Sequence, residues 1–190
     1  MSDLVDLVRI RLRFLPLDPA KRVLEPAQRV TPQLVVASEE ALGFALPHEL
    51  KRLYAEIGNG GFGPGYGLLG LLKGATDDLG ETAVQKYATL RNDSMQKGGI
   101  PWPTNLLPIC NWGCAIYSCI NCSTPIYSME LFDPNPHEDH CTDWRDAFFP
   151  ENCDFCEWIE LWAKGADLWE RSYGANGAIS KILEERRRNR

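Results

Sequence analysis

The sequence predicts an α+β fold, with a central antiparallel sheet and helices packed around it in a single domain. The chain has 190 residues, which is enough for one well-filled core but too few for two ordinary domains. Apolar residues recur at helical spacing in the first half of the chain. Three short apolar runs, near residues 106–110, 114–120 and 125–132, then follow with turn residues between them, as in a small antiparallel meander.

Residues 1–29 are expected to form a helix or a strand followed by a proline-rich lead-in. The apolar residues at positions 4, 5, 8 and 12 fit a helical stripe, but residues 8–14 alternate strictly, as a strand would, so both remain open. Thr31 and Pro32 then predict a helix start, with threonine as the cap. This helix should run to about Leu42, where Gly43 can adopt the left-handed conformation that ends helices.

A second helix is expected from Pro47 onwards, with a buried stripe at Leu50, Leu53, Tyr54 and Ile57. Gly58 and Asn59 tolerate the left-handed geometry that ends a helix. The G-x-G-x-x-G spacing then occurs twice within residues 58–70. A dinucleotide-binding fingerprint needs a strand before the glycines and a helix inside them, whereas here a helix precedes them. We therefore interpret the run as a close turn with positive φ angles that leads into a buried strand at 68–72.

The rest of the chain is expected to contain a further helix ending near residues 97–99, the meander, an acidic loop at 133–143 and a last helix. Asn152 can cap that last helix, which has Phe155, Ile159 and Trp162 at helical spacing. The basic end, ILEERRRNR, is expected to be a solvated tail. The predicted organisation is a lead-in at 1–29, an α+β domain at 30–172 and a basic tail at 173–190.

The net charge of −6 is concentrated late in the chain, because residues 130–160 hold ten acids and only one base, Arg145. A nucleic-acid-binding protein would place bases on its working face, so direct nucleic-acid binding is not expected. No apolar run approaches the roughly 20 residues that span a bilayer, and the N-terminus lacks a signal peptide. The expected location is the cytoplasm, with no membrane partner.

The stretch LFDPNPHEDHCTDWRDAFFPENCDF places acidic residues beside aromatic ones. Aromatic anchors with charges around them are typical of a protein-binding face. The candidate face consists of Asp133, Glu138, Asp139, Asp143, Trp144 and Asp146. An equally open interpretation is that the aromatics belong to the core and the acids only keep the surface soluble.

The cysteines offer one possible metal site. Cys119 and Cys122, with Cys153 and Cys156, have the pair spacing of a four-thiolate zinc site, although cysteines on strands are often small core residues. The prediction is no cofactor, with structural zinc as the open alternative. No G-x-S-x-G or H-E-x-x-H motif occurs, so an enzyme is not expected.

The run LGFALPHELKRLYAEIGNGGFGPGYGLLGL resembles the signature of the SUKH superfamily, immunity proteins related to a fungal cell-wall-assembly regulator. The matching residues are Gly43, Leu46, Pro47, Tyr54, Asn59, Gly60 and Gly61, and later Trp112 and Gly113 in LLPICNWGCAIYSCINC. The resemblance covers roughly residues 30–170. It implies an α+β fold and binding rather than catalysis, with a toxin domain, often a nuclease, as the partner.

The charge pattern and the resemblance together suggest an immunity protein that neutralises a basic toxin domain through the acidic face. The alternative is a zinc-stabilised regulatory or scaffold protein without a toxin partner. Both hypotheses describe non-catalytic protein-binding modules.

Overall fold

The computed structural model describes residues 3–14, 25–96, 99–137 and 143–188. Its helices are α1 (Leu4–Phe14), α2 (Pro32–Leu42), α3 (His48–Glu56), α4 (Ala83–Met95), α5 (Phe155–Ala163), α6 (Leu168–Tyr173) and α7 (Ala178–Arg188), with a short 3-10 helix, η1 (Trp144–Ala147). Its strands are β1 (Leu106–Gly113), β2 (Ile116–Asn121), β3 (Ser128–Phe132) and β4 (Phe148–Asp154). The predicted α+β class is confirmed.

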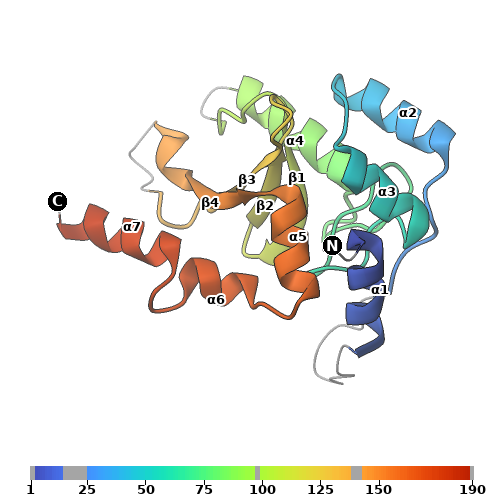
Figure 1. The fold of residues 1–190 in the computed structure, drawn as a ribbon. Coiled ribbons are helices and arrows are strands. Elements are labelled where there is room, and N and C mark those ends of the chain that lie inside the picture. The colour runs from blue at the N-terminus through green and yellow to red at the C-terminus, as the bar shows by residue number, and fades with distance from the viewer. Residues whose placement is uncertain (1–2, 15–24, 97–98, 138–142, 189–190) are drawn as a thin grey trace.

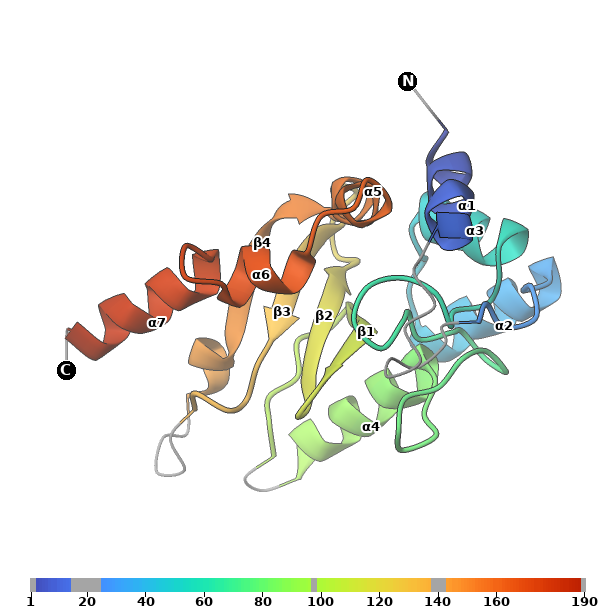
Figure 2. The same cartoon turned by 90° about the horizontal axis from the view of Figure 1, so that it is seen from below.

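The four strands form one antiparallel sheet in the order β1-β2-β3-β4. Figures 1 and 2 show this sheet lying between α4 on one side and α5 and α6 on the other. The meander predicted from the three apolar runs is confirmed as β1, β2 and β3. The sheet also contains β4, which was not predicted: the acidic loop was expected to end at residue 143 and the next helix to begin at Asn152, with no element between them.

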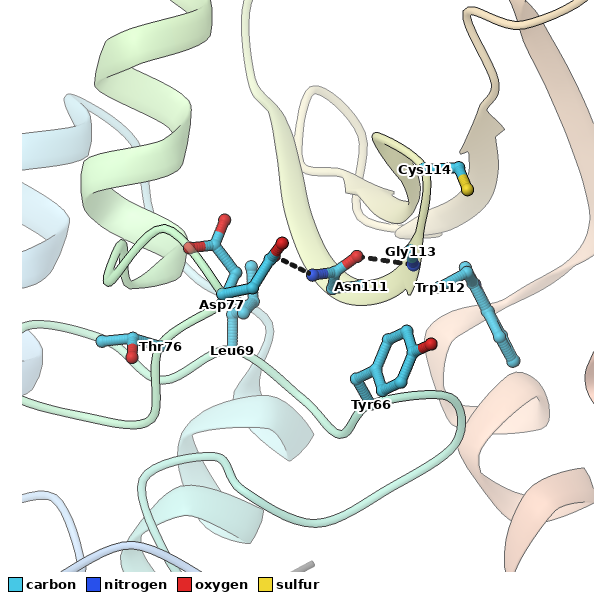
Figure 3. A pocket seen from close by; sticks show the side chains of 9 residues that line it. Tyr66, Leu69, Thr76, Asp77, Asn111, Trp112, Gly113 and Cys114 are labelled. Atoms are coloured by element: carbon cyan, nitrogen blue, oxygen red, sulfur yellow. Dashed lines mark hydrogen bonds between the residues drawn. The ribbon is translucent and has the colours of Figure 1, made fainter. Parts of the chain in front are cut away.

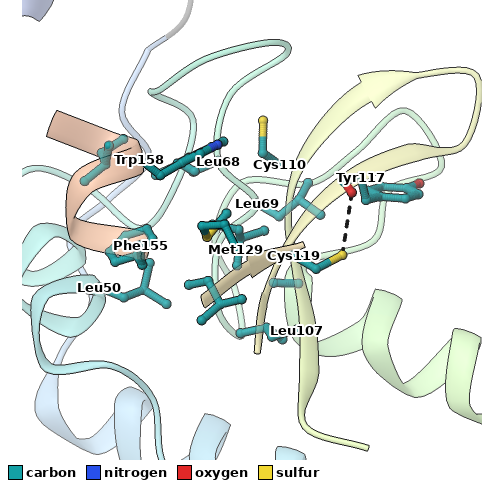
Figure 4. Close-up of a cluster of buried hydrophobic side chains, with 14 of the residues drawn as sticks. Leu50, Leu68, Leu69, Leu107, Cys110, Tyr117, Cys119, Met129, Phe155 and Trp158 are labelled. Carbon is teal, nitrogen blue, oxygen red and sulfur yellow. Dashed lines mark hydrogen bonds between the residues drawn. The ribbon is translucent and has the colours of Figure 1, made fainter. Parts of the chain in front are cut away.

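The main core forms where α3, the glycine-rich loop, the sheet and α5 meet (Figure 4). Leu50 of α3, Leu107 of β1 and Phe155 of α5 are all buried there. A second, smaller cluster forms where α7 packs on the sheet through Ile179, which contacts Leu131 and Phe149.

The predicted start of α2 at Thr31 is confirmed by its cap, and a cap that was not predicted starts α4. The Thr31 hydroxyl accepts a hydrogen bond from the Leu34 amide, and Gly43 ends α2 with a φ of 79°. Thr82 and Gln85 form a reciprocal capping box at the start of α4. The helix predicted to begin at Asn152 is α5. Asp154 rather than Asn152 is its N-cap. Asn152 lies within β4.

The glycine-rich segment after α3 is a tight turn, as predicted. Gly60 and Gly61 have φ angles of 78° and 80°, and a Cβ atom on Gly60 would lie 2.5 Å from the Leu68 carbonyl oxygen. The helix end was expected wrongly at Gly58 and Asn59, because α3 ends at Glu56 and its C-cap, Ile57, has a negative φ. The predicted strand after the turn is also absent, since the described residues 68–72 make only one isolated bridge, between Leu68 and Cys110.

Asn59 holds this loop together from inside. Its buried side chain accepts a hydrogen bond from the Leu71 amide at 2.7 Å and donates one to the Leu72 carbonyl at 3.1 Å. Tyr54 of α3 also holds the loop, because its hydroxyl donates a hydrogen bond to the Leu69 carbonyl at 2.5 Å. Two signature residues therefore serve to fix the glycine-rich loop against α3.

The two ends of the described chain are both helical. The N-terminal segment is the helix α1 rather than a strand, and its buried residues Val5 and Val8 join the main core. The C-terminal residues up to Arg188 form α7 instead of a solvated tail, with Ile179 only 1% exposed. The domain limits at residues 29 and 172 stay predictions.

Candidate partner-binding surfaces

The acidic segment, defined here as residues 133–146, is organised around a histidine. The His137 Nδ1 atom lies 2.7 Å from an Asp146 carboxylate oxygen, and the His137 ring stacks on Trp144 with 3.8 Å between centroids. Trp144 is half-buried as a result. Asp143, Trp144 and Asp146 thus lie together in and just before η1, as the candidate face requires.

Asp143 is held by its neighbour Arg145. It caps η1 by accepting a hydrogen bond from the Arg145 amide, and its two carboxylate oxygens receive the Arg145 guanidinium at 2.9 Å and 2.5 Å. The guanidinium lowers the pKa of the Asp143 carboxyl to about 2. Asp143 is therefore ionised at any physiological pH, but part of its charge is already balanced.

Asp133 is not on the predicted face. It is only 3% exposed, and its carboxylate accepts hydrogen bonds from the Tyr173 hydroxyl and from the amide and side chain of Asn135. Its role is structural, because it joins the end of β3 to α6. The remaining two predicted residues, Glu138 and Asp139, lie outside the described residues.

The α7 helix brings basic residues to this segment. Arg186 donates a hydrogen bond to the Asp146 carbonyl at 2.6 Å, and its guanidinium lies 4.9 Å from the centre of the Phe149 ring. This neighbourhood was not predicted, because the basic end was expected to be a solvated tail. The positive charge of Arg186 therefore balances part of the negative charge of the described residues in the acidic segment.

A second candidate surface is a groove of about 400 Å³ beside the glycine-rich loop, called here the Tyr66–Trp112 groove (Figure 3). It is lined by Tyr66, Leu69, Thr76, Asp77, Asp78, Asn111, Trp112, Gly113 and Cys114. The end of β1, the turn that follows it and two loops meet there. Trp112 and Gly113 were predicted only as structural signature residues. Their position in the lining of a groove was not predicted.

Asn111 fixes the walls of the Tyr66–Trp112 groove (Figure 3). Its side chain donates to an Asp78 carboxylate oxygen at 3.0 Å and accepts from the Gly113 amide at 2.7 Å. Its carbonyl accepts from the Tyr66 amide at 3.0 Å. One residue of β1 thereby positions both loops that form the groove.

Asp77, one of the lining residues of the groove, belongs to a buried ion pair. The Lys86 ammonium lies 2.9 Å from the Asp77 carboxylate and also contacts Glu81, with the Lys86 side chain 6% exposed. Burial alone would lower the pKa of Lys86, but its bonds to Glu81 and Asp77 outweigh burial and raise the pKa. Burial raises the pKa of the nearby Tyr117 to about 12, so its hydroxyl stays protonated and donates to Asp77.

Aromatic side chains flank the groove. Tyr66 is 55% exposed, and the Trp112 ring lies tilted beside Trp169 with 5.5 Å between centroids, while Trp169 stacks on Tyr173 at 4.3 Å. The Trp112 indole N–H donates to the Ser118 hydroxyl at 2.9 Å, which fixes the ring. Exposed aromatics on rigid supports are typical hot spots of protein interfaces.

The proposed four-thiolate zinc site is not formed. In the part of the chain that the structure describes, no three His, Cys, Asp or Glu side chains gather closely enough to hold a metal ion. Cys119 is buried in the core between Tyr117 and Leu107 instead (Figure 4). Burial raises the pKa of Cys122 and of Cys153 to about 12, so both stay protonated thiols.

None of the helices within the described ranges has the length and apolar character that a membrane crossing needs. No curated protein matches the chain. The sequence profile of the SMI1/KNR4 family (SUKH-1), in contrast, matches residues 29–160, which include the signature residues and all four strands of the sheet. The chain therefore belongs to the SMI1/KNR4 family (SUKH-1), a family of generally non-catalytic immunity proteins.

Proposed function

We propose that this protein is an immunity protein that binds and neutralises a cognate toxin domain of basic charge, such as a nuclease. The observation that carries the proposal is membership of a family of immunity proteins, in a chain with a net charge of −6. The protein acts in the cytoplasm of the cell that it protects. It works by occupying the toxin's working face rather than by chemistry.

The acidic segment is the proposed contact surface. A nuclease must attract phosphate and therefore presents a basic face, which an acidic partner finds quickly by electrostatic steering. Asp143 and Asp146 supply the charge, Trp144 supplies the aromatic anchor, and Glu138 and Asp139 extend the same segment. The η1 turn, the pair between His137 and Asp146 and the cap at Asp143 support this geometry.

The chemistry of the thiols supports binding rather than catalysis. A nucleophilic cysteine needs a lowered pKa, but burial raises the pKa of Cys110, Cys119, Cys122 and Cys153. These cysteines serve as packing residues.

The test is to capture the protein with its partner from the cells that make it. The captured protein is identified, expressed alone to measure growth inhibition, and then expressed together with the immunity protein. Growth arrest that co-expression relieves, in a one-to-one complex released by salt, is the expected result. A captured partner that does not inhibit growth would contradict the proposal.

The surface is then tested with Asp143→Asn and Asp146→Asn together. Asparagine keeps one oxygen acceptor at each position, but at residue 143 an amide group replaces one of the two oxygens that receive the Arg145 guanidinium. The melting temperature of the double variant therefore checks that the fold persists while two charges are lost. The association rate and its salt dependence should both fall. Glu40→Gln, a change at an exposed acid on α2, is the matched control. Unchanged association in the double variant would place the contact surface elsewhere.

A further inference from the structure

The Tyr66–Trp112 groove combines exposed aromatic rings with uncompensated negative charge. We propose that this groove binds an arginine side chain of the partner, with the guanidinium against the rings of Tyr66 and Trp112 and paired with the carboxylate of Asp78. This inference rests on the proposed function, because it assigns that arginine to the toxin domain. It adds a second contact site outside the acidic segment.

The charges of the groove favour a cation. None of its nine lining residues is basic, and two of them, Asp77 and Asp78, are acids. Lys86 is shared between Asp77 and Glu81, so these three groups together carry one negative charge and Asp78 adds another. Asp77 is already satisfied by Lys86 and by backbone amides, which leaves Asp78 as the carboxylate that an incoming cation can pair with.

Asp78 is exposed and keeps acceptor positions open. Among the described residues only the Asn111 side chain bonds to its carboxylate, at Oδ1 and 3.0 Å, and a carboxylate offers about four acceptor positions. Figure 3 shows the Tyr66 ring below Asn111 and beside Trp112, so aromatic surface and polar groups border the same space. This is the arrangement that a cation over an aromatic face requires.

The aromatic rings favour arginine over lysine. A guanidinium is planar and weakly hydrated, so it can stack on an aromatic face while it donates in its plane to a carboxylate. An ammonium is a strongly hydrated point charge, and it loses more on leaving water for a half-apolar groove. The groove therefore selects the shape of the cation as well as its charge.

The groove is preorganised and adjoins the acidic segment. The loop that carries Tyr66 is tied by the Gly67 amide to the Pro64 carbonyl at 2.9 Å and by the Tyr66 amide to β1. A site that is already ordered loses little entropy on binding. On its other side, the Asn135 side chain donates to the Cys114 carbonyl at 3.2 Å, so one partner can cover the groove and the acidic segment together.

The experiment uses small peptides, so that it does not depend on the toxin. The peptide acetyl-Gly-Arg-Gly-amide is titrated into isotopically labelled protein, and the amide of Gly113 and the indole N–H of Trp112 are followed by NMR. The lysine peptide and the citrulline peptide, which is a neutral isostere of the arginine one, are titrated in parallel. Saturable shifts at Gly113 and Trp112 with the arginine peptide, weaker with lysine and absent with citrulline, are expected.

Two variants test the assigned residues. Asp78→Asn keeps an acceptor for Asn111 and removes the charge, and it should weaken the arginine peptide about tenfold. Tyr66→Ala should weaken it several-fold through the lost aromatic face. Glu40→Gln on α2 should leave binding unchanged, and the melting temperature of each variant checks that the fold is intact. Equal binding of arginine and citrulline, or unchanged binding by Asp78→Asn, would overturn the inference.

The peptide result and the toxin result are separable. If the peptide binds but no toxin is captured, the groove assignment stands and the proposed function fails. If the toxin complex forms and the peptide does not bind, the acidic segment alone is the contact surface. When both succeed, Asp78→Asn should also weaken the toxin complex by about tenfold.

Discussion

Glu151 on β4 makes the stability of this fold depend on pH. Its Oε1 atom accepts a hydrogen bond from the Trp158 indole at 3.1 Å, but within the described residues its Oε2 atom is buried without a hydrogen-bond partner. Burial raises the pKa of Glu151 to about 7, against an ordinary value of 4.5. The native protein therefore holds this carboxyl protonated at pH values where the unfolded chain has already lost the proton.

The sign and size follow from linkage. Between pH 4.5 and about 7 the native state binds more protons at Glu151 than the unfolded state, so the free energy of unfolding falls as the pH rises. At about 1.4 kcal/mol per pH unit, the full loss is roughly 3 kcal/mol and is complete near pH 8. Glu151→Gln does not titrate, so it should become more stable relative to the natural protein by that amount across this range.

The assay is urea unfolding of the natural protein, Glu151→Gln and Glu40→Gln at pH 5, 6, 7 and 8. Other titrating groups affect all three proteins alike, so the difference between Glu151→Gln and the natural protein isolates Glu151. That difference should grow by about 2.5 kcal/mol from pH 5 to pH 8, well beyond any change in the difference for the exposed control Glu40→Gln. A Glu151→Gln difference that is constant with pH would refute the reasoning.

Three further substitutions test the fold. Asn59→Ala removes the groups that satisfy two buried backbone positions and should lower the free energy of unfolding in urea by about 2–4 kcal/mol. Lys86→Met leaves Asp77 buried without its cation and should cost about 3–5 kcal/mol at pH 7 but less at pH 4, where Asp77 can take up a proton more easily; thermal melting at both values checks this. Ile179→Ala should cost about 2–4 kcal/mol in the same urea assay because α7 packs on the sheet, whereas Lys181→Ala, at an exposed position of α7, should cost under about 0.5 kcal/mol. Equal effects of the two α7 changes would support a solvated tail.

Local signals in the sequence predicted much of this fold. Thr31 is a cap that acts within one helical turn, and the apolar runs of the meander are separated by short turns. These features depend on neighbours a few residues apart, which is why they can be read from the chain alone. The helical spacing of Ile179, Ile182 and Leu183 was overlooked, because residues 173–190 were expected to form a basic tail.

The features that the sequence did not reveal depend on distant partners. Asp133 has the charge of a surface residue, but Tyr173 covers it from α6. The strand β4 contains Pro150, which is tolerated because β4 is at the edge of the sheet. The Tyr66–Trp112 groove exists only because Asn111 ties the glycine-rich loop and residue 78 to β1, and neither pattern nor composition indicates such a meeting.

The packing of α1 on α5 has a consequence for synthesis and folding. The part of the core that contains Val5 and Val8 also needs α5, which is translated late. Most of the chain must therefore leave the ribosome before this part of the core can close. Contacts between segments that are far apart in the sequence require a long loop to close, and this slows folding. A fragment that begins at residue 29, where the family match starts, would leave the α1 docking surface on α5 open to water. Such a fragment should aggregate during expression, whereas the chain from Met1 should not.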